Sequence, residues 1–113
     1  MERFTDWMNE GVVKDNELYG YKMTKQLKMA DGTLISIQAS DGHYCAPRRY
    51  LKSYNDYWEF EIGFPTKKID CLMPYAEDSE NPTDTVYGYV PIEVIQEAIE
   101  SCGGVVGFRD EKE

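Results

Sequence analysis

The chain has 113 residues, 42% of them hydrophobic and 13% aromatic, which supplies enough apolar material for one core but is too short for two. No stretch approaches the ~18 apolar residues of a membrane span, and the N-terminus lacks a signal peptide's apolar run, so we expect a cytoplasmic protein without membrane contact. The formal charge of −9 argues against nucleic acid as the main ligand, because an acidic surface repels phosphates.

The acidic residues are concentrated in the C-terminal half of the chain. Residues 1–52 hold eight bases and seven acids, whereas residues 53–113 hold four bases and fourteen acids. This asymmetry predicts that the C-terminal half attracts basic proteins. Alternatively, the charge only keeps the protein soluble.

Residues 1–10 are predicted to form an N-terminal helix. Phe4, Trp7 and Met8 recur at helical spacing, and Gly11 follows where a helix would end.

A β-hairpin is predicted next, after a connection at residues 12–20 that contains a brief strand. Residues 22–29 and 33–39 alternate in polarity on either side of Asp31 and Gly32, a dipeptide that favours tight turns. The side chains predicted to face the core are Met23, Leu27, Met29, Ile35, Ile37 and Ala39. Those predicted to face water are Lys22, Thr24, Gln26 and Lys28.

Residues 40–56 read as a long loop, rich in turn-forming residues. Long loops in compact domains are often functional, so this segment is the first place to look for a site. Its bases, Arg48, Arg49 and Lys52, are too few to make the domain a nucleic-acid binder.

A second strand region is predicted at residues 57–62, which alternate strictly. Trp58, Phe60 and Ile62 would face the core, while Tyr57, Glu59 and Glu61 would face water. Thr66 would then cap a short helix with an apolar stripe of Ile69, Leu72 and Met73, interrupted at Pro74.

The C-terminal region predicts a strand at residues 85–90 and a helix opened by Pro91. Gly103 and Gly104 would end that helix, and residues 109–113 would fray. The apolar side of the helix consists of Ile92, Ile95, Ala98, Ile99 and Cys102. The whole chain is thus a single α+β domain, with a mainly antiparallel sheet of about four strands and helices packed on one face.

An acidic, tyrosine-containing segment is the candidate partner-binding site. Its residues are Tyr75, Glu77, Asp78, Glu80, Asp84 and Tyr87. Tyrosine gives contact area at low entropic cost, and the carboxylates would attract a basic groove. The alternative is an ordinary acidic turn beside strand tyrosines.

His43 and Cys45 are the candidates for metal or thiol chemistry. With Cys71 and Cys102 they would make four zinc ligands, although only His43 and Cys45 are close in sequence. The odd number of cysteines in a chain without an export signal predicts free thiols. Neither a cysteine-protease signature nor a nucleotide-binding motif is present, so we expect no enzyme and no cofactor.

The segments 31–40, 42–48, 73–78 and 87–91 resemble small phage and prophage proteins, over most of residues 30–104. That group includes inhibitors of host defence, among them anti-CRISPR proteins that occupy basic nucleic-acid channels. The resemblance implies a non-enzymatic inhibitor in the bacterial cytoplasm, with a basic nucleic-acid-binding host protein such as a CRISPR effector as its partner. The alternatives are a metal- or thiol-stabilised domain using His43 and Cys45, or an accessory protein of phage assembly.

Overall fold

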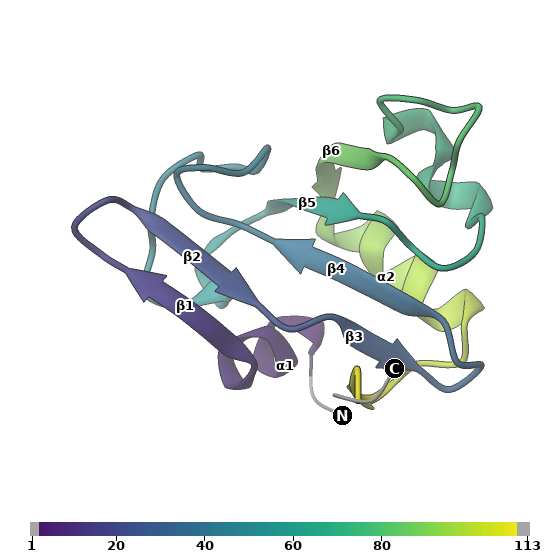
Figure 1. Cartoon of the computed structure of the whole chain (residues 1–113), viewed down its shortest axis with the longest axis horizontal. Coiled ribbons are helices and arrows are strands. Elements are labelled where there is room, and N and C mark those ends of the chain that lie inside the picture. The colour runs from purple at the N-terminus through teal and green to yellow at the C-terminus, as the bar shows by residue number, and fades with distance from the viewer. Residues whose placement is uncertain (1–2, 111–113) are drawn as a thin grey trace.

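The computed structural model describes residues 3–110 and contains a five-stranded sheet, a separate two-stranded sheet and two α-helices (Figure 1). The helices are α1 (Phe4–Glu10) and α2 (Ile92–Ser101), and the 3-10 turns are η1 (Tyr54–Asp56) and η2 (Asp70–Tyr75). The strands are β1 (Val12–Asn16), β2 (Tyr21–Thr24), β3 (Leu27–Met29), β4 (Leu34–Gln38), β5 (Glu59–Gly63), β6 (Val86–Pro91) and β7 (Val105–Phe108).

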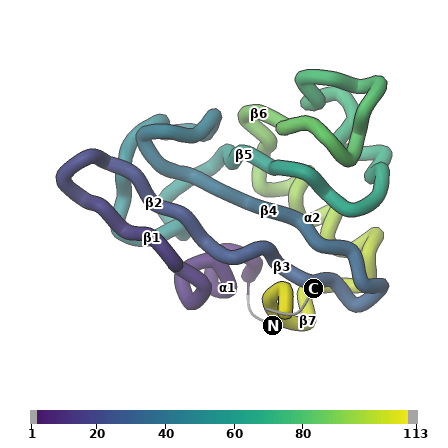
Figure 2. The backbone as a smooth tube through the Cα atoms, in the orientation of Figure 1, coloured from purple at the N-terminus to yellow at the C-terminus, as the bar shows by residue number. Residues whose placement is uncertain are grey.

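The main sheet has the order β6-β5-β4-β3-β7, and each neighbouring pair is antiparallel. The remaining strands, β1 and β2, form a hairpin that projects from the main sheet (Figure 2). The predicted α+β class and antiparallel sheet are confirmed. The predicted number of about four strands is too low, because residues 22–29 divide into two strands and residues 105–108 add one at the sheet edge.

In residues 22–24, which lie in the first of these two strands, the buried and exposed side chains are the reverse of those predicted. Lys22 is only 3% exposed and Met23 is 37% exposed, while Thr24 is buried. This reversal is possible because the buried polar groups have partners. The Lys22 ammonium donates to the carbonyls of Leu51 and Lys52, and it lies 4.7 Å from the Tyr54 ring centroid. Burial lowers the pKa of Lys22, although Asp15 opposes this shift.

The hairpin between β3 and β4 turns at Asp31 and Gly32, as predicted. The Thr33 amide donates to the Asp31 carboxylate at 2.9 Å, and Gly32 has a φ of +93° that favours glycine. Leu27 and Met29 from one strand, and Ile35 and Ile37 from the other, are buried as expected, as is Ala39 just beyond β4.

The prediction for residues 57–62 is wrong at its first two positions. Trp58 is 58% exposed, whereas Tyr57 is buried. Regular strand structure begins only at Glu59, so the alternation does not extend back to these residues. The Tyr57 hydroxyl donates to the Arg49 carbonyl at 2.6 Å and accepts the Leu51 amide at 2.8 Å, which anchors the long loop.

Downstream of β5, the predicted short helix is instead the 3-10 turn η2. Thr66 does not cap it, since its hydroxyl accepts the amide of Leu34 at 2.9 Å. The longer helix α2 forms as predicted, and it is followed by Gly103 and Gly104 with φ angles of +90° and +93°.

Apolar side chains from the sheet, both helices and η2 form one core. Its largest members include Tyr54, Tyr57, Tyr87, Phe60, Met8, Leu27, Met29, Ile35, Ile37, Ile62, Leu72 and Ile95. Arg109 begins the tail predicted to fray, and its amide and guanidinium both donate to Gln26, at 3.0 and 2.8 Å. Residues 111–113 lie outside the described part of the chain, as do residues 1–2 of the predicted N-terminal helix.

Candidate functional site

The acidic turn between η2 and β6 is ordered by one of its own carboxylates. Asp78 accepts the backbone amide of Glu80 at 3.2 Å and the side-chain amide of Asn81 at 2.9 Å. The amide of Asp84 donates to the carbonyl of Asn81 at 2.9 Å. Asp78 therefore has a structural role in the turn, which distinguishes it from the other three acids of the predicted site.

The other three predicted acids are free to meet a partner. Glu77, Glu80 and Asp84 are exposed, and within residues 3–110 none of their carboxylates takes part in an ion pair or hydrogen bond. Because Asp78 and the backbone hold the turn, these carboxylates are presented on a preformed scaffold.

The two predicted tyrosines differ in accessibility. Tyr75 is partly buried and packs against the core, so part of its ring remains available. Tyr87 is fully buried in β6, and its hydroxyl donates to the carbonyl of Pro82. Its side chain is therefore not exposed to a partner in this structure, because strand alternation turns it into the core.

Helix α2 adds two exposed carboxylates that sequence analysis did not assign to the site. Glu93 and Glu97 are one helical turn apart on its solvent side. The helix packs against η2, where the Cys71 thiol lies 3.8 Å from the carbonyl of Val94. Burial raises the pKa of Cys71, and nearby Glu97 raises it further, which places Glu97 beside η2.

We name Glu77, Glu80, Asp84, Glu93 and Glu97 the acidic surface. Three of them lie in or beside the turn that joins η2 to β6, and two lie on α2, the helix that packs against both η2 and β6 (Figure 1). The helical spacing of the glutamates was visible in the sequence. The position of α2 against η2 and β6 was not, because it depends on tertiary packing.

The loop containing His43 and Cys45 is held by buried polar contacts. The Ser40 hydroxyl lies 2.7 Å from Nδ1 of His43, and the Cys45 thiol donates to the Ser40 carbonyl at 3.3 Å. The Tyr21 ring packs on His43, with centroids 5.2 Å apart. Burial lowers the pKa of His43 and raises the pKa of Cys45, which favours a neutral imidazole and a protonated thiol. A nucleophilic cysteine requires the thiolate, so this environment disfavours thiol catalysis.

The four candidate zinc ligands are not brought together. Cys71 lies against α2, and Cys102 ends that helix with its sulfur 3.8 Å from the Ser101 hydroxyl. Among residues 3–110, no group of three or more histidine, cysteine, aspartate or glutamate side chains is placed to hold a metal ion.

His43 should make folding stability fall as the pH drops below the ordinary histidine pKa of 6.5. It is the chain's single histidine, and its folded pKa lies below the ordinary value of 6.5 because the ring is buried. The unfolded state therefore binds a proton that the folded state resists, so the free energy of unfolding should fall as pH drops below about 6.5. The slope for one proton is at most about 1.4 kcal/mol per pH unit.

Urea unfolding at several pH values measures this slope. The variant His43→Gln cannot titrate in this range and should show a flatter dependence, whatever its absolute stability. An equal slope in both proteins would show that His43 is not responsible.

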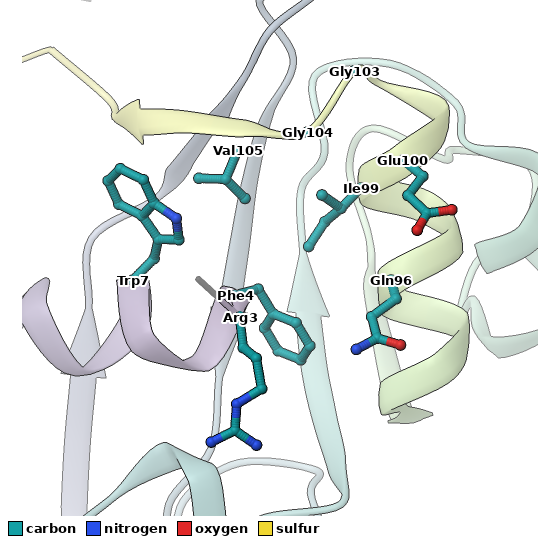
Figure 3. Close-up of a pocket in the computed structure, with 9 residues that line it drawn as sticks. All are labelled: Arg3, Phe4, Trp7, Gln96, Ile99, Glu100, Gly103, Gly104 and Val105. Atoms are coloured by element: carbon teal, nitrogen blue, oxygen red, sulfur yellow. The ribbon is translucent and has the colours of Figure 1, made fainter. Parts of the chain in front are cut away.

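A groove lies between α1, α2 and β7 (Figure 3). It has a volume of about 510 Å³, within the range of ~300–1,000 Å³ typical of ligand sites. The residues that line it are Arg3, Phe4, Trp7, Gln96, Ile99, Glu100, Gly103, Gly104 and Val105. Sequence analysis did not identify it, because its residues come from opposite ends of the chain.

Comparison with known proteins adds no family or fold relationship. No protein-family model matches the chain, and neither the curated proteins nor the solved structures contain a match. Within the described residues, no helix combines the length and apolar character needed to cross a membrane.

Proposed function

We propose that this chain is a non-enzymatic binding protein that docks through its acidic surface onto a basic, nucleic-acid-binding protein of a bacterial host. The observation that carries the proposal is the set of five exposed carboxylates on the acidic turn and on α2, the helix that packs against the two elements joined by that turn. The resemblance to phage proteins, which include inhibitors of CRISPR effectors, suggests the kind of target.

The charge arrangement supports binding by competition with nucleic acid. Clustered carboxylates steer a protein towards a basic groove and raise its association rate, and salt weakens this attraction. A basic groove that accepts the acidic surface is then no longer free to bind phosphates. Partly exposed Tyr75 would add contact area beside the charges.

The test is capture from bacterial lysate by the immobilised protein and by a Glu80→Lys, Asp84→Lys variant. A specific target should be retained at about 50 mM salt, released at about 500 mM, and captured at least ~10-fold less by the variant. Added DNA should compete for the same target. Because Asp78 orders the turn, the thermal unfolding midpoint of the variant should be unchanged.

A matched control separates the site from net charge. The variant Glu10→Lys, Glu17→Lys makes the same charge change at exposed residues of α1 and the β1–β2 connection. It should capture the target normally. Equal loss in both double variants, or no captured nucleic-acid-binding protein, would contradict the proposed function.

A further inference from the structure

The groove in Figure 3 has an apolar centre and oppositely charged ends. Phe4, Ile99 and Val105 supply apolar side chains from three different elements. Arg3 lies at the start of α1, and Glu100 lies in the last turn of α2. An occupant that complements this groove has an apolar group between a negative and a positive charge.

Trp7 adds a directional polar group to the groove. Its indole nitrogen is turned towards the groove in Figure 3, and within residues 3–110 it has no hydrogen-bond partner. An indole N–H can only donate, so it selects an acceptor such as a peptide carbonyl. The indole also packs edge-on against Phe108, with centroids 5.5 Å apart, which fixes its position.

A strand edge borders the groove. β7 is an outermost strand of the main sheet, and within the described part of the chain β3 is the strand that pairs with it. Val105 begins β7 and also lines the groove, while Val106 is 58% exposed. An unpaired edge carries backbone donors and acceptors that can bind an added strand.

We propose that the groove and the outer edge of β7 together bind an extended peptide segment of a partner protein. The segment carries a bulky apolar residue, with a basic residue two positions to one side and an acidic residue two positions to the other. In an extended peptide, residues at this spacing point to the same face, so all three side chains meet the groove. The apolar residue contacts Phe4, Ile99 and Val105, while the charged residues pair with Glu100 and Arg3.

This peptide site goes beyond the proposed function, because none of its residues belongs to the acidic surface. It can therefore be tested with synthetic peptides, whether or not a basic target is found. The acidic surface can likewise be tested without affecting the peptide site, since Glu80 and Asp84 do not line the groove.

Trp7 itself can report binding. The chain has two tryptophans, so Trp58→Phe, a change at an exposed position, leaves Trp7 as the only one. This protein is titrated with acetylated seven-residue peptides that have leucine, phenylalanine or alanine at the centre. Each peptide has a lysine two positions to one side of the centre and a glutamate two positions to the other side. Both arrangements, with lysine before or after the centre, are tested.

A peptide with a bulky centre, in one of the two orders, should change Trp7 emission saturably with a dissociation constant of about 10–100 μM. The alanine-centred peptide should bind at least ~10-fold more weakly, because it lacks the apolar contact. Moving both charges next to the centre should weaken binding similarly, since they then point away from the groove.

Two charge variants on the same helix test the orientation. Glu100→Lys should weaken binding of the preferred peptide at least ~5-fold, whereas Glu93→Lys, which makes the same charge change outside the groove, should not. The proposal is overturned if no peptide binds below about 1 mM, or if the two variants behave alike. It is also overturned if light scattering shows a dimer whose dissociation on dilution changes Trp7 emission, because a second copy would then occupy the groove.

Discussion

Replacing Phe60 with alanine should lower the free energy of unfolding by about 4 kcal/mol. Phe60 is fully buried in β5, and its ring makes an edge-to-face contact with Phe4, with centroids 5.3 Å apart and planes at 74°. It also lies 5.9 Å from the Tyr57 ring. The substitution removes apolar burial and leaves a cavity where the sheet meets α1. Small domains are stable by only about 5–15 kcal/mol, so this loss is large.

Urea unfolding followed by far-ultraviolet circular dichroism measures the effect. Phe60→Leu keeps most of the volume and should lose only about 1–1.5 kcal/mol. Trp58→Phe, at the exposed position two residues earlier, should change stability by less than about 0.5 kcal/mol. A loss below about 1 kcal/mol for Phe60→Ala would mean that the ring is not at the centre of the core.

The second large effect is expected at Gln38, where leucine should lower the free energy of unfolding by about 3 kcal/mol. The buried Gln38 amide accepts the backbone N–H of Thr24 and donates to its carbonyl, both at 2.9 Å. It also donates to the Ser36 hydroxyl at 3.0 Å. These bonds join β2 to β4, so leucine would leave two buried backbone groups of Thr24 without their partner.

Two measurements separate this role from general packing. Hydrogen exchange at amides of the β1–β2 hairpin should accelerate more than exchange in β5, because the lost bonds join the two sheets. Gln96→Leu makes the same chemical change on the exposed side of α2 and should cost less than about 0.5 kcal/mol. Equal stability of Gln38→Leu and the unmodified protein would contradict the assigned role.

Sequence periodicity correctly predicted the buried side chains of elements that have one apolar and one polar face. Helix α2 buries Ile95, Ala98 and Ile99 as its apolar stripe indicates, and β5 buries Phe60 and Ile62. In such elements the hydrophobic effect selects the same face that the pattern shows.

Periodicity failed where polar groups found partners inside the protein. The Lys22 ammonium can be buried because it donates to two backbone carbonyls and lies over the Tyr54 ring, and the Thr24 hydroxyl can be buried because it donates to the carbonyl of Met8. Tyr57 replaces Trp58 in the core because its hydroxyl bonds to the long loop. Hydrogen-bond partners offset the free-energy cost of burying a polar group. Because these partners are distant in the sequence, the local pattern of polar and apolar residues does not predict them.

The candidate site was partly visible in the same way. The acidic turn could be located from its composition, but the separation of Asp78 as a structural residue required its hydrogen bonds, and the burial of Tyr87 required the sheet. The groove could not be predicted, because it joins α1 to α2 and β7, which are about ninety residues apart in the chain.

By itself, the sequence determined the α+β class, the turn at Asp31 and Gly32, helix α2 and the concentration of acids in the C-terminal half. These properties depend on local conformation, on periodic burial and on charge, all of which are encoded in neighbouring residues. The tertiary structure decided the strand order, the buried position of Lys22 and the packing of α2 against η2 and β6. Those features depend on contacts between segments that are far apart in the sequence, and such contacts form only when the chain folds.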